Sequence, residues 1–388
     1  MQCVELFTGC GGLAMGLSRA GFKALRMSEW DKHSILNVNH NKDNGIAFVK
    51  DWPIHHEDVR SVDWAQFKRV DIVAGGPPCQ PFSIGGLHRG HHDGRDMWPE
   101  AVRAVREIQP IGFLFENVRG LTRAAFSDYL EWVRLSLSLP EIAQGKRESR
   151  AGHLTRLRKA TRATGQQYNV KIYQANAADF GAAQKRHRVF ILGLRQGMGD
   201  LPGLEPTHSR ESLLWDQWIS GEYWRRHNRR VPVTGPNSVD ITTIERLKAS
   251  KAKPVLLPWR SVRDALVGLD EPGKRSKVAN HVLQPGARAY AGHTGSPIDM
   301  PAKALKAGVH GVPGGENMMA LPNGEVRYFT VREAARLQGV PDEFEFIGSW
   351  SENMRQCGNA VPVPLAQHVA TKMRSAIERS NVKGRAAA

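Results

Sequence analysis

Short apolar runs alternate with helical patterns through the first 194 residues, and this alternation limits the fold more than any other feature. Runs without polar alternation indicate strands that are buried on both faces. The runs that read as strands are Val4–Phe7, Ala24–Ser28, Val70–Ala74, Phe113–Glu116, Val170–Gln174 and Val189–Leu194. The helical patterns between them are Leu13–Ala20, Trp98–Ile108 and Phe126–Leu137. The sequence therefore predicts an α/β fold with a doubly wound, Rossmann-like sheet of parallel strands.

Two stretches interrupt this rhythm. Residues 139–168 are basic and read as an insertion before the strand at Val170–Gln174. Residues 195–327 are rich in Gly and Pro, lose the alternation, and read as a smaller, irregular second domain. We therefore expect a first domain over residues 1–194, a second over 195–327, and a helical C-terminal segment over 328–388.

A glycine-rich turn, FTGCGG at residues 7–12, follows the first predicted strand. Glycines in this position let the backbone turn tightly and approach a ligand at the N-terminus of the next helix. Glu29 follows the next strand, at a distance where an acidic residue can bond ribose hydroxyls. With Ala14, the turn also satisfies the dinucleotide fingerprint. This segment predicts a nucleoside-containing cofactor, without choosing between a methyl donor and NAD; an ordinary strand-to-helix turn is the alternative.

Reactive or charged side chains follow three later strands. Cys79 comes after two prolines and precedes a Gly-rich loop at residues 83–95, which favours a nucleophile under a movable lid over a buried structural thiol. Glu116 ends an apolar run and is a candidate acid with a raised pKa, unless it forms a helix cap or surface ion pair. Arg186 and Arg188 alternate onto one face of a strand, where they could hold a phosphate and a base carbonyl or form a solvated strand end.

The positive charge is concentrated in the later part of the chain. Lys and Arg total 54 against 38 Asp and Glu, a net charge of +16. Residues 1–140 are neutral, whereas 141–188 carry +8 and 195–327 carry +6. This excess predicts a polyanion such as nucleic acid as partner. The candidate phosphate contacts in the basic-aromatic cluster are Arg225, Arg226, Arg229 and Arg230; a solvated face over a small aromatic core is the alternative.

Several other classes of protein are excluded by the sequence. No run of about 18 apolar residues is present, so no membrane span is expected. No signal peptide is evident at the N-terminus. The four cysteines lie far apart without a C-x-x-C pair, which fits a reducing cytosol and predicts neither a disulfide framework nor a metal site.

In their order along the chain, these motifs resemble those of the DNA cytosine-5 methyltransferase family. FTGCGG is similar to the cofactor loop of that family, SEWD to its ribose-binding turn, and PPCQPFS to its nucleophile loop. ENV and QKRHR are similar to its acid and paired-arginine motifs, and Arg332–Pro341 and Gly358–Ala366 to its last two motifs. The resemblance implies a methyltransferase sheet, with residues 195–327 as the target-recognition domain.

The resemblance implies a role for each reactive residue. Cys79 would attack C6 of a cytosine that has flipped out of the DNA duplex. Glu116 would bond N3 and the exocyclic amine, and Arg188 would bond O2. Arg186 would help to hold the site and the nearby backbone, and Ser83 would contact the DNA. The two basic blocks of the sequence are expected to line the DNA cleft.

The resemblance also implies S-adenosyl-L-methionine as the cofactor and S-adenosyl-L-homocysteine as the product. The residues expected to bind this cofactor come from both ends of the chain, so the C-terminal helix is expected to fold back onto the first domain. They are Phe7, Gly9, Cys10, Gly12, Glu29, Trp30, Asp58, Val59, Pro78, Asn359, Ala360 and Val361.

The sequence is accordingly identified as a member of the bacterial type of DNA (cytosine-5)-methyltransferase, acting on a short duplex sequence in a restriction–modification system. We expect a monomer in the bacterial cytoplasm, associated with the nucleoid, that needs no metal or membrane and shares only DNA sites with a cognate restriction endonuclease. A tRNA cytosine methyltransferase is the first alternative, but the long variable region argues against it. The hypothesis of an NAD-dependent oxidoreductase gives no role to Cys79 and Glu116. A non-catalytic DNA-binding module would not need these two residues.

Overall fold

The structure is a computed structural model that describes residues 1–78, 96–164, 166–273, 276–290, 294–307, 317–321 and 323–386. Cys79, Ser83 and the loop at residues 83–95 lie outside the described residues, as does the Gly-rich stretch at 308–316. Within the described part of the chain, no helix has the length and apolar character that a membrane crossing requires.

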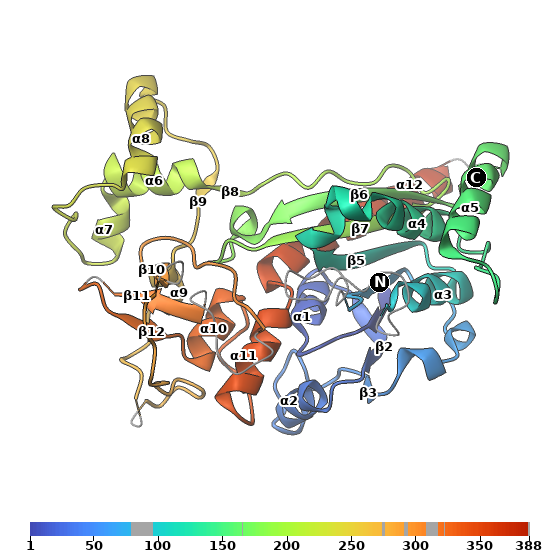
Figure 1. The fold of residues 1–388 in the computed structure, drawn as a ribbon, viewed down its shortest axis with the longest axis horizontal. Coiled ribbons are helices and arrows are strands. Elements are labelled where there is room, and N and C mark those ends of the chain that lie inside the picture. The colour runs from blue at the N-terminus through green and yellow to red at the C-terminus, as the bar shows by residue number, and fades with distance from the viewer. Residues whose placement is uncertain are drawn as a thin grey trace.

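A seven-stranded sheet with the order β3-β2-β1-β4-β5-β7-β6 forms the centre of the first half of the chain (Figure 1). This confirms the α/β fold with a doubly wound, Rossmann-like sheet. Each predicted apolar run lies within or overlaps a strand, and β3, which has only one apolar residue, was not predicted. The strands are β1 (Gln2–Leu6), β2 (Lys23–Glu29), β3 (Ile54–His56), β4 (Ile72–Gly75), β5 (Gly112–Val118), β6 (Tyr168–Asn176) and β7 (His187–Arg195).

The expectation that all strands are parallel is wrong for β7. This strand pairs antiparallel with both β5 and β6, whereas β1, β2, β3, β4 and β5 pair in parallel. The connection from β6 to β7, residues 177–186, contains only the short helix η6 (Ala177–Phe180). A parallel return needs a crossover of about a dozen residues or more, usually with a full helix, so the chain reverses direction instead.

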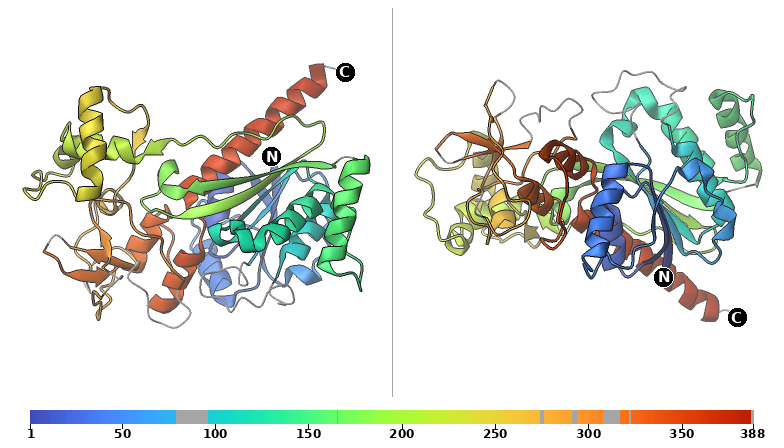
Figure 2. Two further views of the ribbon diagram at one scale, coloured as in Figure 1. Left: turned by 45° about the horizontal axis from the view of Figure 1, so that its top comes forward. Right: turned by 90° about the horizontal axis from the view of Figure 1, so that it is seen from below.

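Helices cover both faces of the sheet (Figure 2). Along β5 the side chains alternate: Phe113 and Phe115 join the core beneath α3 (Trp98–Ile108) and α4 (Ser127–Ser138), and Leu114 joins the core beneath α1 (Gly12–Arg19) and α12 (Val363–Ala386). The helix α2 (Lys32–Asp43) follows β2. This alternation is what strands buried on both faces require.

The last helix returns to the first, as expected. The helices α1 and α12 are so close that a Cβ added at Gly16 would lie 2.4 Å from the Cβ of Ala366. Two further helices precede α12, namely α10 (Val331–Leu337) and α11 (Trp350–Asn359). Their apolar residues share one core cluster with Cys10 and Met15 at the start of the chain. The two ends of the chain therefore form one packed unit.

The elements between β7 and α10 extend beyond one end of the sheet (Figure 1). They contain short strands and helices, in agreement with the irregular character of their sequence. These elements are β8 (His208–Ser209), α6 (Arg210–Trp218), α7 (Glu222–Arg226), α8 (Ser238–Ser250), β9 (Leu257–Pro258), α9 (Val262–Leu266), β10 (Ser296–Pro297), β11 (Met318–Ala320) and β12 (Val326–Tyr328).

The basic segment before β6 lies at the opposite end of the molecule. It forms the helix α5 (Arg150–Thr164), which packs on α4, while α6–α8 stand beyond the other end of the sheet (Figure 1). The strand β6 runs from α5 toward the sheet edge near α6 and has nine residues, a length of about 30 Å. The first basic block, residues 141–188, is therefore divided: Arg186 and Arg188 lie at the end of the sheet nearest α6, and α5 lies at the opposite end.

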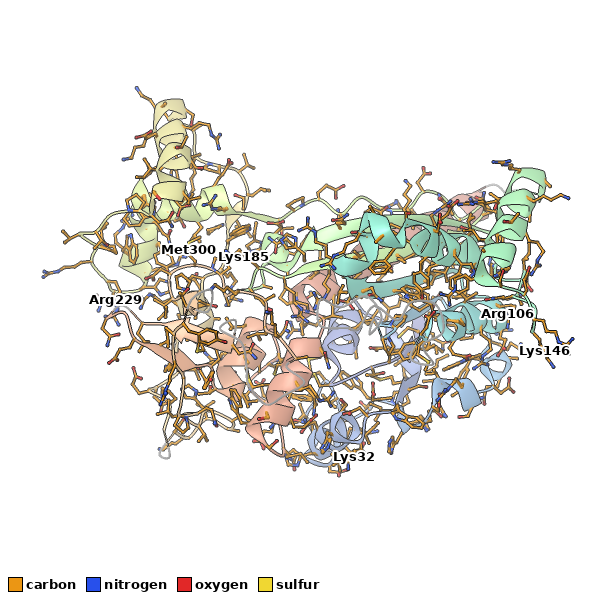
Figure 3. All side chains as sticks on the ribbon, viewed as in Figure 1. Lys32, Arg106, Lys146, Lys185, Arg229 and Met300 are labelled. Atoms are coloured by element: carbon orange, nitrogen blue, oxygen red, sulfur yellow. The ribbon has the colours of Figure 1, made fainter. Side chains whose placement is uncertain are left out.

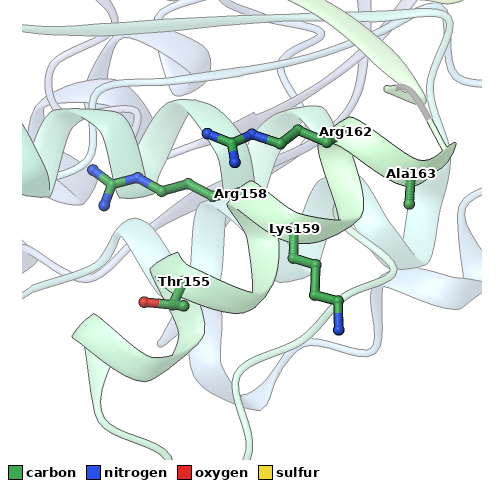
Figure 4. Close-up of a pocket in the computed structure, with 5 residues that line it drawn as sticks. All are labelled: Thr155, Arg158, Lys159, Arg162 and Ala163. Atoms are coloured by element: carbon green, nitrogen blue, oxygen red, sulfur yellow. The ribbon is translucent and has the colours of Figure 1, made fainter.

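Figure 4 shows the exposed side of α5, where three basic side chains, Arg158, Lys159 and Arg162, surround a shallow pocket of about 500 Å³. Arg158 forms an ion pair with Glu131. A pocket whose lining comes from one surface helix is the gap between long side chains. We therefore assign α5 no part in the candidate active site.

Candidate active site

The candidate catalytic carboxylate and one of the two arginines meet at the sheet edge where β5 ends and β7 begins. Nε of Arg188 lies 2.6 Å from Oε1 of Glu116, and the two side chains are 12% and 9% exposed. Burial raises the pKa of Glu116, while the charges of Arg188 and Arg186 oppose that increase. A carboxyl with a raised pKa beside fixed positive charge can hold a proton and donate it in a hydrogen bond.

The segment that leads to Cys79 passes directly over this carboxylate. A Cβ added at Gly76 would lie 3.4 Å from Oε2 of Glu116. Nδ2 of Asn117 donates a hydrogen bond of 3.1 Å to the carbonyl oxygen of Pro77. Asn117 was not assigned a role from the sequence, although its position next to Glu116 at a strand end was a signal. It fixes the approach of the chain to Cys79.

Cys79 lies outside the described residues, so its role as the nucleophile stays a prediction. The other cysteines, Cys3, Cys10 and Cys357, are all buried. Burial raises the pKa of each of these thiols, that of Cys10 to about 12. Because the thiolate is the reactive form, these three are poor nucleophiles near neutral pH.

Arg186 is buried inside the protein and binds backbone. Its guanidinium donates to the carbonyl oxygen of Leu305 at 2.8 Å and to that of Gly358. The neighbouring Gln184 accepts a hydrogen bond of 2.9 Å from the backbone N–H of Leu305. These contacts join the start of β7 to the end of α11. The sequence indicated the importance of Arg186 but gave no sign of these partners.

The glycine-rich turn has the left-handed backbone that its glycines were expected to allow. Gly9 and Gly11 have φ angles of 58° and 90°, and Phe7, which is not a glycine, has a φ of 58°. The carboxylate of Glu29 accepts hydrogen bonds from the backbone N–H groups of Gly9 at 2.6 Å and Asp31 at 2.7 Å. Burial raises the pKa of Glu29. Glu29 therefore fixes the turn.

The turn leaves space for a ligand on one side and contacts the C-terminal motif on the other. A Cβ added at Gly9 would meet nothing within 4 Å, but one added at Gly12 would lie 2.5 Å from the carbonyl oxygen of Val361. The thiol of Cys10 donates to the carbonyl oxygen of Gln356 at 3.8 Å. Ala360 is buried beside these residues, while Asn359 is exposed. Two motifs from opposite ends of the chain thus pack against each other.

Gln338 holds this C-terminal turn in place. Its side-chain N–H donates to the carbonyl oxygen of Cys357, and its backbone carbonyl oxygen accepts a hydrogen bond of 2.8 Å from the backbone N–H of Val363. Gln338 is fully buried. The motif at Arg332–Pro341 in the sequence pointed to this segment, but the partner residues follow only from the fold.

The remaining residues expected at the cofactor differ in their exposure. Trp30 is 66% exposed, Pro78 is exposed, and Val59 is buried. The carboxylate of Asp58 caps a short helix and binds the side chain of Arg60, which lowers the pKa of Asp58. Among the described residues, no three His, Cys, Asp or Glu side chains are grouped as a metal site.

The basic-aromatic cluster divides into a core and a surface. Tyr223 and Trp224 are buried, and Arg226 stacks on Tyr223 at 4.8 Å from the ring centre. Arg226 also forms ion pairs of 3.1 Å with both Asp216 and Asp264. These internal partners hold the guanidinium of Arg226, whose side chain is 31% exposed, and its contact with DNA stays a prediction.

The other three arginines of the cluster are exposed. Arg225 forms an ion pair of 2.7 Å with Glu222 and remains 70% exposed. Arg229 lies at the end of the molecule opposite Lys146 in Figure 3. Arg229 and Arg230 form no ion pair with any described carboxylate, so they stay candidates for phosphate contact.

Comparison with known proteins identifies similar sequences along almost the whole chain. Residues 1–137 and 153–375 match the family described as C-5 cytosine-specific DNA methylase. The gap in this match overlaps the expected insertion at residues 139–168. Type II methyltransferase M.NgoMIV of Neisseria gonorrhoeae is 26% identical, covering 97% of this chain and 98% of its own. Type II methyltransferase M.FnuDI of Fusobacterium nucleatum is 28% identical, covering 97% and 95%.

Two solved structures show the same fold at lower identity. A putative DNA modification methyltransferase encoded within an E. coli prophage has a TM-score of 0.53 and 21% identity, covering 97% of this chain and 99% of its own. The S. pombe Dnmt2 methyltransferase has a TM-score of 0.56 and 15% identity, covering 97% and 98%. These likenesses support the arrangement of sheet and helices described above.

Proposed function

Because the chain belongs to the C-5 cytosine-specific DNA methylase family, we propose individual catalytic and binding roles for the residues at the sheet edge. The protein is a DNA (cytosine-5)-methyltransferase, and its curated relatives are type II methyltransferases of restriction–modification systems. Each role assigns one part of this reaction to a particular side chain.

We infer that the methyl donor is S-adenosyl-L-methionine, which supplies an electrophilic methyl group when bound. The open space beside Gly9 and the buried carboxylate of Glu29 fit a ligand with a ribose. Phe7 and Trp30 lie at the ends of β1 and β2, where an adenine would stack. Gly12 and Val361 close the other side of this pocket.

Cys79 is the proposed nucleophile. Addition of its thiolate to C6 of cytosine would raise the electron density at C5, the atom that is methylated. Once C5 carries the methyl group, transfer of the C5 proton to a water molecule and elimination of the Cys79 thiolate would restore the aromatic ring. The cytosine must leave the DNA stack for this attack, because C6 is inaccessible in a paired duplex.

Glu116 and Arg188 are proposed to bind the flipped base. The raised pKa of Glu116 allows it to hold a proton and donate it to N3, which stabilises the adduct at C6. Arg188 would bind O2, and Arg186 would hold the backbone at Leu305 and Gly358. The single observation that carries this proposal is the contact of Glu116 with Arg188 beneath the segment that leads to Cys79.

We propose duplex DNA as the acceptor and a monomer as the acting form. The cell compartment would be the bacterial cytoplasm at the nucleoid, where a cognate endonuclease would meet this protein only through shared DNA sites. The proposed DNA contacts outside the catalytic residues are Ser83, Arg225, Arg226, Arg229 and Arg230.

A methyl-transfer assay tests this function. The protein is incubated with S-adenosyl-L-methionine labelled in the methyl group and with mixed bacterial genomic DNA, with tRNA, or with no acceptor. Label is expected in DNA, at C5 of cytosine. Label in tRNA but not in DNA would overturn the assignment of the acceptor.

A further inference from the structure

The elements beyond the sheet are bonded to the turn between β6 and β7. We call residues 177–183 the junction turn. The backbone N–H of Thr207 donates a hydrogen bond of 2.9 Å to the carbonyl oxygen of Asp179, and that of Ala302 donates one of 2.9 Å to the carbonyl oxygen of Ala183. Figure 1 shows β8 and β9 at this place, between α6 and the sheet. Two segments that are far apart in sequence therefore meet the sheet at one turn.

The side chain of Asp179 adds a third contact at the same turn. Its Oδ1 accepts a hydrogen bond of 2.9 Å from Nε1 of Trp259. Both side chains are half-buried. The ring of Trp259 packs against the small core formed by Leu213, Tyr223 and Trp224. One carboxylate thus joins the junction turn to the interior of the basic-aromatic cluster.

The backbone at Trp259 is fixed by strand pairing. Its N–H donates a hydrogen bond of 3.0 Å to the carbonyl oxygen of Ser209, and the N–H of Leu257 donates one of 3.0 Å to that of Thr207. These bonds accompany the parallel pairing of β8 with β9. The two groups that bind Asp179 therefore belong to one small sheet, and they hold this residue from both its backbone and its side chain.

The other side of the junction turn is bonded to the base-binding strand. The N–H of Ala177 donates a hydrogen bond of 2.9 Å to the carbonyl oxygen of Arg186, whose own N–H donates one of 3.1 Å to Oδ1 of Asn176. In the register of β6 and β7, Ala175 is opposite Arg188. A displacement of the junction turn would therefore be passed to both arginines.

The bond between Asp179 and Trp259 has properties that suit it to fix a position. Burial raises the pKa of Asp179, while the hydrogen bond from Trp259 and the charge of His187 oppose that increase. A hydrogen bond to an ionised acceptor is stronger than one between neutral groups. Neither side chain has the many torsions of Lys or Arg, so ordering them costs little conformational entropy.

We propose that Asp179 is a positioning residue that fixes the elements α6–α9, the proposed target-recognition domain, relative to Arg186 and Arg188. A domain held in one position delivers the target cytosine to these arginines only when the flanking sequence is bound correctly. A looser connection would let a base reach the site while the recognition contacts are misaligned. Both the rate and the discrimination between sequences would then fall. This inference rests on the proposed function.

Replacing the donor tests the role of this hydrogen bond. Trp259→Phe removes the N–H and keeps an aromatic ring, so kcat/KM for duplex DNA is expected to fall about two- to tenfold, the contribution of one hydrogen bond. Affinity for S-adenosyl-L-methionine should not change. The matched control is Trp218→Phe, the same replacement in the same core, which should keep kcat/KM near that of the wild type. Asp179→Asn retains an oxygen acceptor and should also stay near the wild type, whereas Asp179→Ala should resemble Trp259→Phe.

Mapping of methylated cytosines gives a readout that a loss of stability alone would not change. Each variant methylates mixed bacterial genomic DNA, and bisulfite sequencing locates the products. The ratio of methylation at the recognised sequence to that at sequences differing by one base pair is expected to fall about two- to tenfold for Trp259→Phe and for Asp179→Ala. The double variant should lose no more than either single variant, because both remove the same bond.

Three results would count against these expectations in different ways. Wild-type kcat/KM per folded molecule and wild-type ratios in Trp259→Phe and Asp179→Ala would overturn the role of Asp179, even if both variants unfold at a lower temperature. Additive losses in the double variant would overturn it too, because the two side chains would then act separately. If the wild type transfers no methyl group to DNA, the proposed function itself fails.

Discussion

Nε of Arg188 lies 2.6 Å from Oε1 of Glu116, across two neighbouring antiparallel strands. In the register of β5 and β7, Arg188 is opposite Val118 and Glu116 is opposite Phe190, so the contact is diagonal. The same arginine that orients the carboxylate also limits the rise in its pKa. In the proposed roles, a flipped cytosine would be bound by two groups that are already in contact with each other.

Replacing the carboxylate should separate binding from chemistry. Glu116→Gln keeps the size of the side chain but removes the proton donor, so methyl transfer is expected to fall by about 10²- to 10⁴-fold. DNA affinity should change less than threefold. Single-turnover transfer of labelled methyl groups measures the first quantity, and Glu148→Gln beside α5 is the control. Wild-type turnover by Glu116→Gln would remove this residue from the mechanism.

Removing the proposed nucleophile should abolish turnover. Cys79→Ala is expected to lose all detectable methyl transfer and to keep its affinity for duplex DNA, because no other cysteine has an accessible thiol of ordinary pKa. Cys3→Ala, in the interior of β1, is the matched control and should retain turnover. Activity in Cys79→Ala and its absence in Cys3→Ala would reverse the assignment.

The glycine-rich turn can be tested by adding a single methyl group at two positions. Gly9→Ala places its Cβ in open space at a φ of 58°, so it should cost about 1–2 kcal/mol of stability and lower cofactor affinity at least tenfold. Gly12→Ala would press on Val361, with a stability loss of about 1–3 kcal/mol. Thermal unfolding and calorimetric titration with S-adenosyl-L-methionine measure the two effects.

Gly45 provides the control for that comparison. It has a φ of 68° with nothing within 4 Å of an added Cβ, but it lies outside the turn. Gly45→Ala should therefore show a similar stability loss and unchanged cofactor affinity. If Gly9→Ala and Gly45→Ala bind the cofactor equally well, the space beside Gly9 is not its site.

The pH dependence of stability should reveal a buried carboxyl beneath the turn. Glu5 is 1% exposed, accepts a hydrogen bond from the N–H of Ala14, and leaves Oε1 without a partner. Burial, together with the charge of Glu29, raises its pKa well above 4.5. The folded state therefore binds this proton more tightly than the unfolded state does. The resulting stabilisation is complete below about pH 4.5 and is lost as pH rises through the raised pKa.

Glu5→Gln removes this titration. The variant is expected to be more stable than the wild type at pH 8.5, by about 1–3 kcal/mol, the cost of an unsatisfied buried group. The difference in the free energy of unfolding between Glu5→Gln and the wild type should become smaller toward pH 5. Chemical denaturation at several pH values measures the difference. A difference that stays constant with pH would show that Glu5 does not titrate in this range.

The sequence predicted the parts of this protein that depend on local pattern. The strands β1, β4 and β5 contain short apolar stretches, and the turn after β1 has glycines at two of its positive φ angles. The predicted direction of β7 was wrong because an apolar run does not indicate whether a strand pairs in parallel or antiparallel with its neighbours. The short connection of residues 177–186 was the available clue.

Partners that lie far apart in sequence could not be predicted in this way. In the sequence, Arg226 lies in a basic run, which suggests a side chain that faces solvent. The fold places Asp216 and Asp264 against this side chain. Asn117 has no pattern that points to the carbonyl oxygen of Pro77. Such contacts depend on the arrangement of whole elements, which a charge count along the chain does not describe.

The two basic ends of the molecule should differ in their effect on DNA binding. Replacing Arg229 and Arg230 together by Gln should reduce the slope of log K against log salt by about 1.8, since each lost phosphate contact contributes about 0.9. Replacing Lys159 and Arg162 removes the same charge from α5, which lies about 30 Å from the catalytic edge along β6. That second variant should leave the slope within experimental error of the wild type. If the α5 variant has the larger effect, the DNA binds across the opposite end of the sheet, and α5 rather than the basic-aromatic cluster carries the phosphate contacts.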